Sequence, residues 1–285
     1  MLKTKKFLLF TVVSLMSILL LAACNSGEDN ATGTGSEAEG ENENANADTN
    51  VLEEIKNRDK IIFGVKNDSR LFGLKNPSTG EVEGFDIDIA KQLAKEILGD
   101  ENKVEFKEVT SKTRIPLLNK GDIDAIIATM TVTEERSKEV DFTDIYFEAG
   151  QSLLVKKGSP VQSIDDLTKD TTVLAVKGST STDNIRAAAP DAPVLEFENY
   201  AEAFTALQAG KGEALTTDDA ILAGMASEDD SFELVGGQFT EEPYGIAVKK
   251  GEKEFREALN AALESVKSSG EYDKIYDSWF EGLLK

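Results

Sequence analysis

Histidine is missing from this sequence of 285 residues, cysteine occurs once, and basic side chains are few. Without histidine the chain has no Ser-His-Asp triad, no histidine general base and no histidine metal ligand. The single cysteine, Cys24, excludes disulfides within the chain and zinc sites made of several cysteines. With 31 Lys and Arg against 53 Asp and Glu the formal net charge is −22, which argues against nucleic-acid binding because phosphate binders need clustered basic residues. Catalysis by carboxylates and binding without catalysis remain open, and neither a metal nor a cofactor is expected.

The N-terminus contains an apolar segment, but residues 7–23 fall short of the roughly 20 apolar residues that a membrane-spanning helix needs. Lys3, Lys5 and Lys6 precede this segment. A positive flank, an apolar run and small residues before a boundary are typical of a secretory signal peptide, here residues 1–23. Residues 21–24, Leu-Ala-Ala-Cys, resemble a bacterial lipobox. They predict that Cys24 is lipidated, with palmitate among the acyl groups, and becomes the mature N-terminus. An uncleaved anchor with an incidental cysteine is the alternative.

The segment after Cys24 contains no Val, Ile, Leu, Phe, Lys or Arg over residues 25–50, but it holds seven acidic residues. Such a composition buries too little apolar surface to offset the entropy of ordering. Residues 24–50 are therefore predicted to be a lipidated cysteine followed by a disordered acidic tether. They would hold the rest of the chain on the extracytoplasmic face of the cytoplasmic membrane, and a long acidic tether resembles those of Gram-positive lipoproteins.

From residue 51 onward, short apolar runs alternate with amphipathic helical stretches. Residues 61–65 are predicted to form a strand buried on both faces, and the apolar residues of 89–98 repeat at helical spacing. Further strand-like runs occur at residues 104–109, 123–128, 152–155, 173–176, 194–197 and 213–215. This alternation predicts an α/β architecture with mostly parallel sheets, divided between two lobes.

Hydroxyl-rich loops follow three of these runs, at residues 128–133, 177–182 and 216–219. Hydroxyls together with free N–H groups at a helix start can hold a carboxylate or a phosphate. Arg136 can add a forked contact to a carboxylate, and Asp218 can meet an ammonium group. The pattern thus favours a zwitterion site. The alternatives are ordinary helix N-caps and a surface ion pair at Arg136. No loop ends in the Gly-Lys-Ser/Thr of a phosphate loop, which argues against nucleotides.

Several motifs resemble the polar amino-acid solute-binding proteins of ABC importers, the bacterial extracellular solute-binding protein family 3. They are GFDIDIA at 84–90, ATMTVTEER at 128–136, VKGSTS at 176–181 and YGIA at 244–247. The resemblance covers about residues 51–283. It implies a two-lobed, periplasmic-binding-protein-like type II fold with a hinge and an interlobe ligand cleft. Lobe 1 would comprise residues 51–149 plus 245–285, and lobe 2 residues 150–244.

The resemblance also implies which residues bind the ligand. Arg136 would hold the α-carboxylate of an amino acid, helped by Thr131 and by the backbone near Thr180. Asp218 and the backbone of Thr129 would take the α-ammonium group. The complete set of candidate ligand-binding residues is Lys66, Ser111, Arg114, Ala128, Thr129, Thr131, Arg136, Lys177, Ser179, Thr180, Ser181, Tyr200 and Asp218.

The side-chain end of the pocket is expected to decide specificity. Ser111, Arg114 and Lys66 resemble positions of the glutamate- and aspartate-binding subgroup, where such residues meet the distal carboxylate. Tyr200 would add a polar contact, and Phe72 is a candidate wall against the ligand's methylenes. The resemblance therefore implies glutamate or aspartate as the ligand, with glutamine or asparagine as the alternative.

The expected activity is capture without catalysis. A monomer would close its lobes on the amino acid and deliver it to a membrane permease driven by an ATPase. A carboxylate-using enzyme on the same fold is a remote alternative, and a sensor module that reports the ligand to a membrane partner is a third.

Overall fold

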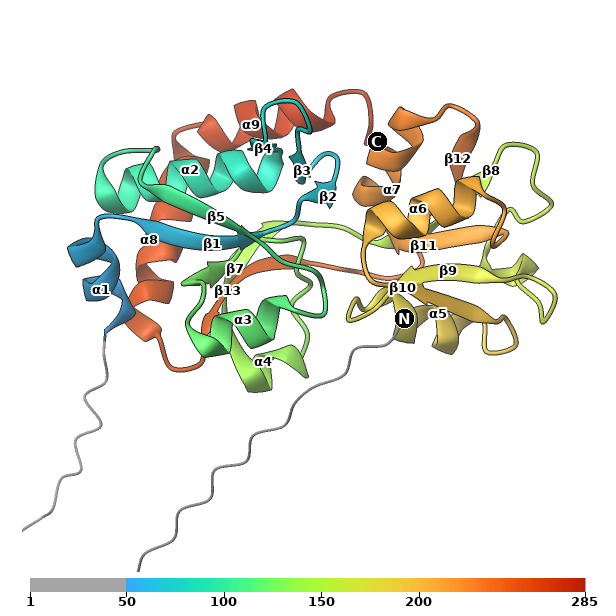
Figure 1. Ribbon diagram of the computed structural model, residues 1–285, viewed down its shortest axis with the longest axis horizontal. Helices are drawn as coiled ribbons and strands as arrows, with labels where there is room; N and C mark the ends of the chain where they lie inside the picture. Colours follow the sequence, from blue (N-terminus) through green and yellow to red (C-terminus); the bar gives the residue numbers. More distant parts are fainter. Residues whose placement is uncertain (1–49, 285) are drawn as a thin grey trace, which may run out of the picture. The chain divides into compact units, whose positions relative to one another are not determined.

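The structure is a computed structural model that describes residues 50–284, and these residues form two α/β lobes (Figure 1). This confirms the predicted fold class. The predicted signal peptide, the predicted lipidation site Cys24 and all of the predicted tether except Asn50 lie outside the described residues. Among the helices of residues 50–284, none is both long enough and apolar enough to cross a membrane.

The first lobe is built on a five-stranded sheet with the order β5-β1-β6-β13-β7. Strands β5, β1 and β6 are parallel, whereas β13 is antiparallel to both β6 and β7. The strands are β1 Ile61–Val65, β5 Val104–Glu108, β6 Ala125–Ile126, β7 Val140–Phe147 and β13 Tyr244–Lys249, and a small antiparallel sheet adds β2 Asp68–Ser69, β3 Gly73–Lys75 and β4 Val82–Glu83. The helices are α1 Val51–Arg58, α2 Phe85–Leu98, α3 Arg114–Lys120, α4 Arg136–Glu139, α8 Lys253–Ser268 and α9 Glu271–Phe280.

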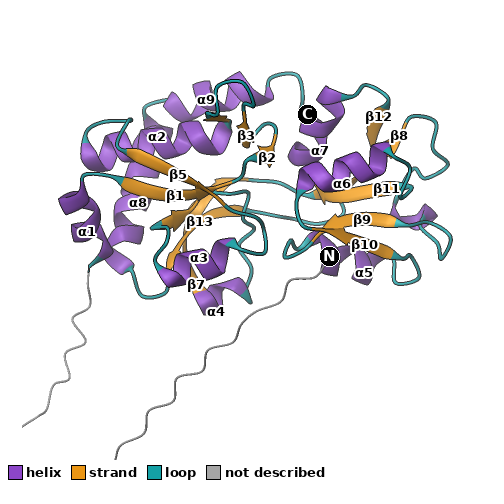
Figure 2. Ribbon diagram, in the orientation of Figure 1, coloured by secondary structure: helices purple, strands orange, loops and turns teal. Residues whose placement is uncertain are grey.

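The second lobe repeats this plan with the strand order β10-β9-β11-β8-β12. Strands β10, β9 and β11 are parallel, whereas β8 is antiparallel to both β11 and β12. The strands are β8 Gln151–Lys156, β9 Val173–Val176, β10 Val194–Phe197, β11 Ala214–Asp218 and β12 Phe232–Val235. The helices are α5 Ser181–Ala188, α6 Tyr200–Gln208 and α7 Asp219–Glu228, with a short 3-10 helix at Ile164–Asp166. In both lobes helices lie on both sides of the strands (Figure 2).

The sheets are mixed, so the prediction of mostly parallel sheets is only half right. Strand β8 enters the second sheet from the first lobe, and it begins beside the end of β11, where Gln151 pairs with Asp218. A strand that enters from the hinge runs away from it, opposite to the parallel strands that end there. Strand β13 returns to the first sheet in the same way.

The chain passes between the two sheets at residues 148–150 and again at residues 236–243. The two passages are held together by backbone hydrogen bonds, from Glu242 N to Ala149 O at 2.7 Å and from Phe239 N to Gln151 O at 2.8 Å. A pair of adjacent extended segments of this kind is a hinge about which two rigid lobes can close.

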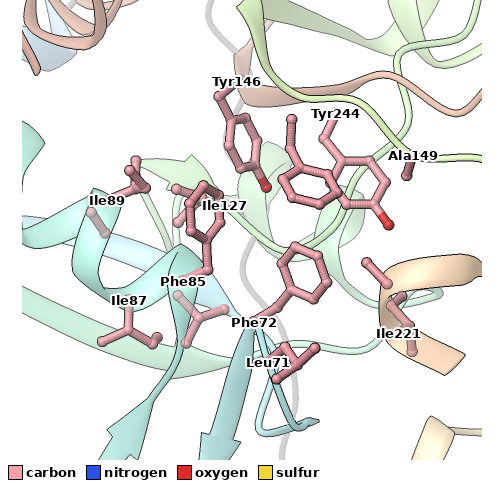
Figure 3. Close-up of a cluster of buried hydrophobic side chains, with 14 of the residues drawn as sticks. Leu71, Phe72, Phe85, Ile87, Ile89, Ile127, Tyr146, Ala149, Ile221 and Tyr244 are labelled. Atoms are coloured by element: carbon pink, nitrogen blue, oxygen red, sulfur yellow. The ribbon is translucent and has the colours of Figure 1, made fainter. Parts of the chain in front are cut away.

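A cluster of buried aromatic side chains, which includes Phe72, Phe85, Tyr146 and Tyr244, lies in the core of the first lobe (Figure 3). Phe72, predicted as a candidate pocket wall, is fully buried in this cluster, and its ring centroid lies 5.1 Å from that of Phe147 and 5.8 Å from that of Tyr244. Phe72 is therefore a core residue. The Tyr244 hydroxyl donates to the carboxylate of Asp218 in the second lobe, so the core supports the site directly.

Candidate functional site

The candidate site residues gather where the parallel strands of both lobes end. Lys66 follows β1, Thr129 and Thr131 follow β6, Thr180 precedes α5, and Asp218 closes β11. Ligands of α/β proteins bind outside the carboxyl ends of such strands. A groove of about 610 Å³ lies between the lobes beside this set, lined by residues that include Ser111, Arg136, Gly178, Ser179 and Thr180 but not the buried Lys66, Arg114, Thr129 or Asp218.

Lys66 is a fully buried cation at one end of this site. Its ammonium donates to the Ser111 hydroxyl at 2.9 Å and lies 4.8 Å from the centre of the Tyr200 ring. Burial, the largest cause, lowers the pKa of Lys66 to about 8, although Asp68 acts in the opposite direction. The three predicted residues Lys66, Ser111 and Tyr200 are thus in contact, across the two lobes.

Arg114 is the second buried cation, with 2% of its surface exposed. Its Nη1 donates to the carbonyl oxygens of Ala128 at 2.7 Å and Thr129 at 3.3 Å. Burial lowers the pKa of Arg114, and the nearby Arg136 contributes to this, but a guanidinium stays protonated in proteins. Arg114 therefore binds the loop after β6 through Nη1, whereas its Nε has no partner among the described residues.

Thr129 adopts a left-handed backbone conformation with φ 47°. Its N–H donates to Asp86 Oδ2 at 3.1 Å, and Asp86 Oδ1 accepts from the Tyr146 hydroxyl at 2.9 Å. Burial raises the pKa of Asp86 to about 7. The candidate set omits Asp86, although it belongs to the GFDIDIA motif. Its carboxylate fixes the strained residue that carries the predicted ammonium contact.

Arg136 connects the lobes. Its Nη1 donates to Thr131 O at 2.8 Å in the first lobe, and its Nη2 donates to Gly178 O at 3.2 Å in the second. The lobes also meet where Tyr200 N donates to Asp68 Oδ2 at 2.6 Å. These bonds require that the lobes be close together, so the structure represents a closed form.

Asp218 is buried with 4% of its surface exposed. Burial is the largest cause that raises the pKa of its carboxyl group to about 7, and Glu242 adds to this effect. The hydroxyl of Tyr244 donates to Oδ2. The hydroxyl of Thr217, the residue before Asp218, donates to the Tyr200 hydroxyl at 3.1 Å.

The loop before α5 divides into outward and inward side chains. Lys177 forms an ion pair with Glu198 at the surface, and this is the contact that the structure gives its ammonium. Ser179 Oγ donates to Val176 O at 2.6 Å and closes the turn. Thr180 and Ser181 point inward, and Ser181 is almost fully buried. The candidate set also omits Glu242, whose Oε2 accepts a hydrogen bond from the Thr180 hydroxyl at 2.7 Å.

Four predicted site residues carry a buried polar atom with no hydrogen-bond partner among the described residues. These atoms are Arg114 Nε, Thr129 Oγ1, Ser181 Oγ and Asp218 Oδ1, and a fifth such atom is Asn67 Oδ1. Buried polar groups in proteins nearly always have partners. A guanidinium donor, a carboxylate acceptor and two hydroxyls suit a ligand with both anionic and cationic groups. Within residues 50–284 no cluster of His, Cys, Asp or Glu could hold a metal ion.

Residues 61–282 match the bacterial extracellular solute-binding proteins, family 3, and the chain belongs to this family. The resemblance drawn from the sequence motifs is thus confirmed, and the family is one of solute-binding proteins that act outside the cytoplasm.

Three similar proteins are informative. The ABC transporter glutamine-binding protein GlnH of Bacillus subtilis (strain 168) is 62% identical over 277 residues, which cover 97% of this chain and 98% of that protein. A glutamine-binding protein of Geobacillus stearothermophilus is 59% identical over 255 residues, which cover 90% of this chain and 96% of that protein. The solved structure of an ancestral arginine-binding protein bound to glutamine is 44% identical, with a TM-score of 0.73, and covers 78% of this chain and 97% of its own.

Proposed function

We propose that the protein is the amino-acid-binding component of an ABC importer and that its ligand is glutamine. The observation that carries the proposal is the set of unpartnered polar atoms, on Arg114, Thr129, Ser181 and Asp218, that complements an amino acid. The glutamine-binding relatives favour the alternative, glutamine, over the acidic ligand that the resemblance put first.

The α-carboxylate would lie between Arg136 and the start of α5. The first N–H groups of a helix have no partner within the helix, and the Ser181 hydroxyl is a further donor there. The α-ammonium group would lie against Asp218 Oδ1. Thr131 was expected to help with the carboxylate, but its hydroxyl donates to Glu242 Oε2 at 2.7 Å. We therefore assign Thr131 to the ammonium group, as an acceptor.

The charge balance of the site supports a neutral side chain on the ligand. Three buried or largely buried cations, Lys66, Arg114 and Arg136, lie beside three buried acids, Asp86, Asp218 and Glu242, so the charges balance once the carboxyl groups of Asp86 and Asp218, whose pKa burial raises to about 7, have lost their protons. Zwitterionic glutamine leaves this balance unchanged, whereas glutamate adds an unpaired negative charge in a desolvated site. The amide oxygen of glutamine can accept from Arg114 Nε or from Lys66.

The mechanism is closure of the lobes on the ligand. The bonds from Arg136 to Gly178 and from Tyr200 to Asp68 join opposite lobes, so they form only on closure. A ligand that contacts both lobes binds the closed form more tightly and shifts the equilibrium towards it. The closed form would then dock on the permease.

The proposal includes the membrane anchor. A lipid on Cys24 and the tether over residues 24–50 would keep a monomeric binding protein at the outer face of the cytoplasmic membrane of a Gram-positive cell. A Cys24→Ala variant should be recovered in the medium instead of the membrane fraction, and retention in the membrane would contradict lipidation.

Isothermal titration calorimetry with the twenty amino acids tests the ligand. Glutamine should bind one to one with a dissociation constant on the order of 1 μM, or about 8 kcal/mol, and glutamate at least about tenfold more weakly. Recovery of the ligand unchanged after incubation would separate binding from the enzymatic alternative. Tight binding of glutamate without binding of glutamine would refute the assignment.

A further inference from the structure

Glu242 is a buried carboxylate that belongs to neither lobe. It lies in the second passage between the sheets, two residues before the start of β13, and its own N–H donates to Ala149 O in the first passage at 2.7 Å. Only 2% of its surface is exposed. A buried carboxylate needs several donors to offset its desolvation.

Four side chains supply those donors. Oε2 accepts from the hydroxyls of Thr131 and Thr180, each at 2.7 Å. Oε1 accepts from Asn184 Nδ2 at 2.7 Å and from the hydroxyl of Thr240 at 3.0 Å. Thr131 follows β6 in the first lobe, whereas Thr180 and Asn184 lie at the start of α5 in the second. One carboxylate oxygen therefore joins the two lobes.

These bonds also fix what each threonine can offer to a ligand. A hydroxyl has one proton to donate, and both threonines give that proton to Glu242. The Thr180 hydroxyl additionally accepts from Gln151 Nε2 at 3.0 Å, so one of its two lone pairs remains. Thr131 keeps free lone pairs and can accept from a donor such as an ammonium group.

We propose that Glu242 is a positioning residue for ligand capture, a role that rests on the proposed function. It orients the Thr131 hydroxyl as an acceptor for the ligand's ammonium group. Through Thr180 and Asn184 it also holds the start of α5, where the carboxylate is received. Since its bonds to the two lobes coexist only when the lobes are closed, Glu242 prolongs the closed form.

The test compares Glu242→Gln with Glu241→Gln, the same change at the adjacent, exposed residue. A glutamine amide has a single acceptor oxygen, so E242Q leaves part of the four-donor set without an acceptor. Stopped-flow fluorescence and calorimetry with glutamine should show a dissociation rate raised about 10- to 100-fold, with the association rate changed less than about threefold. E241Q should match the wild type.

The other outcomes are distinct. Equal kinetics for E242Q and E241Q would overturn the proposal, and so would tighter binding by E242Q, which would mean that Glu242 acts by repelling the ligand's carboxylate. A lower melting temperature with unchanged kinetics would reduce Glu242 to a structural role. If E242Q does not fold, Thr180→Val removes one bond of the same oxygen and should also raise the dissociation rate, whereas an unchanged rate would overturn the proposal.

The failure of the proposed function would be recognised separately. A wild-type protein that binds no glutamine contradicts that function, whatever the variants do. A wild type that binds glutamine, together with an E242Q variant that behaves like E241Q, contradicts only the role of Glu242.

Discussion

At Gly178 the backbones of the two lobes approach each other closely, and a single methyl group there should impair closure. A Cβ placed on Gly178 would lie 2.8 Å from both the Cα and the N of Lys112 and 3.0 Å from the carbonyl carbon of Ser111. These are backbone atoms of the first lobe, so no side-chain rotation relieves the overlap. The Gly178→Ala variant is therefore expected to hold the lobes apart.

The size of the effect follows from the geometry. Carbon atoms pack at about 3.5–4.0 Å, so the loop around Gly178 must retreat by about 1 Å. The bond from Arg136 Nη2 to Gly178 O is already 3.2 Å long, and such a shift breaks it. A hydrogen bond from a charged donor contributes about 1.5–3 kcal/mol, which corresponds to a dissociation constant for glutamine raised about 10- to 100-fold.

Gly158 provides the matched control. It lies in the same lobe with φ 81°, close to the 75° of Gly178, but a Cβ there meets nothing within 4 Å. Both alanine variants bear a similar backbone cost of roughly 1–2 kcal/mol, visible as a lower melting temperature. Only Gly178→Ala should lose affinity in calorimetry. Equal dissociation constants for the two variants would refute the closure argument.

Five further outcomes are expected. Burial raises the pKa of Asp218 to about 7 in the closed site without ligand, so a proton must leave this carboxyl group before it can pair with the ligand's ammonium group. Glutamine affinity should therefore rise as the pH increases from 5.5 to 7 and then level off, and Asp218→Asn should abolish this dependence. Between about pH 4 and 7 the folded protein keeps a proton on Asp218, whereas the unfolded chain has lost it. The free energy of unfolding without ligand, measured in urea titrations, should therefore fall as the pH rises across that range. Arg136→Lys keeps the charge but not the forked geometry, and should weaken glutamine binding about tenfold in calorimetry. Lys177→Ala should leave the dissociation constant unchanged, because the Lys177 ammonium pairs with Glu198 at the surface. Phe85→Ala should lower the free energy of unfolding by about 3–5 kcal/mol, since Phe85 is fully buried in the aromatic cluster.

The elements with a strong local pattern could be predicted from the sequence. Residues 61–65 form β1 as expected, and the apolar residues of 89–98, which repeat at helical spacing, lie in α2. The antiparallel direction of β8 and β13 could not be predicted, because the partners of these two strands depend on where the chain crosses between the lobes. The short strands β2 to β4 have no periodicity to detect, since each contains only two or three residues.

The residues of the candidate site also differ in whether the sequence could predict their role. Thr131 lies in a hydroxyl-rich loop after β6, Arg136 follows that loop at the start of α4, and Asp218 ends β11, so their convergence could be expected from the topology of an α/β sheet. Glu242 gives no such signal. It is one acid among many in a hinge segment, and its importance arises only when Thr131 and Thr180 approach from opposite lobes.

The proposed ligand, glutamine, illustrates why charges counted along the sequence are a poor guide to specificity. From the sequence, Lys66 and Arg114 are predicted to be partners of a second carboxylate on the ligand. The sequence contains these cations but gives no information on the groups that surround them. In the structure Lys66 donates to Ser111, Arg114 donates to two backbone carbonyls, and the acids Asp86 and Asp218 are buried nearby. A desolvated cation attracts an anion only to the extent that its charge is not already balanced. Under the proposed function, the same residues that suggest an acidic amino acid in the sequence therefore form, once folded, a site whose cations already have partners and that suits a neutral amide.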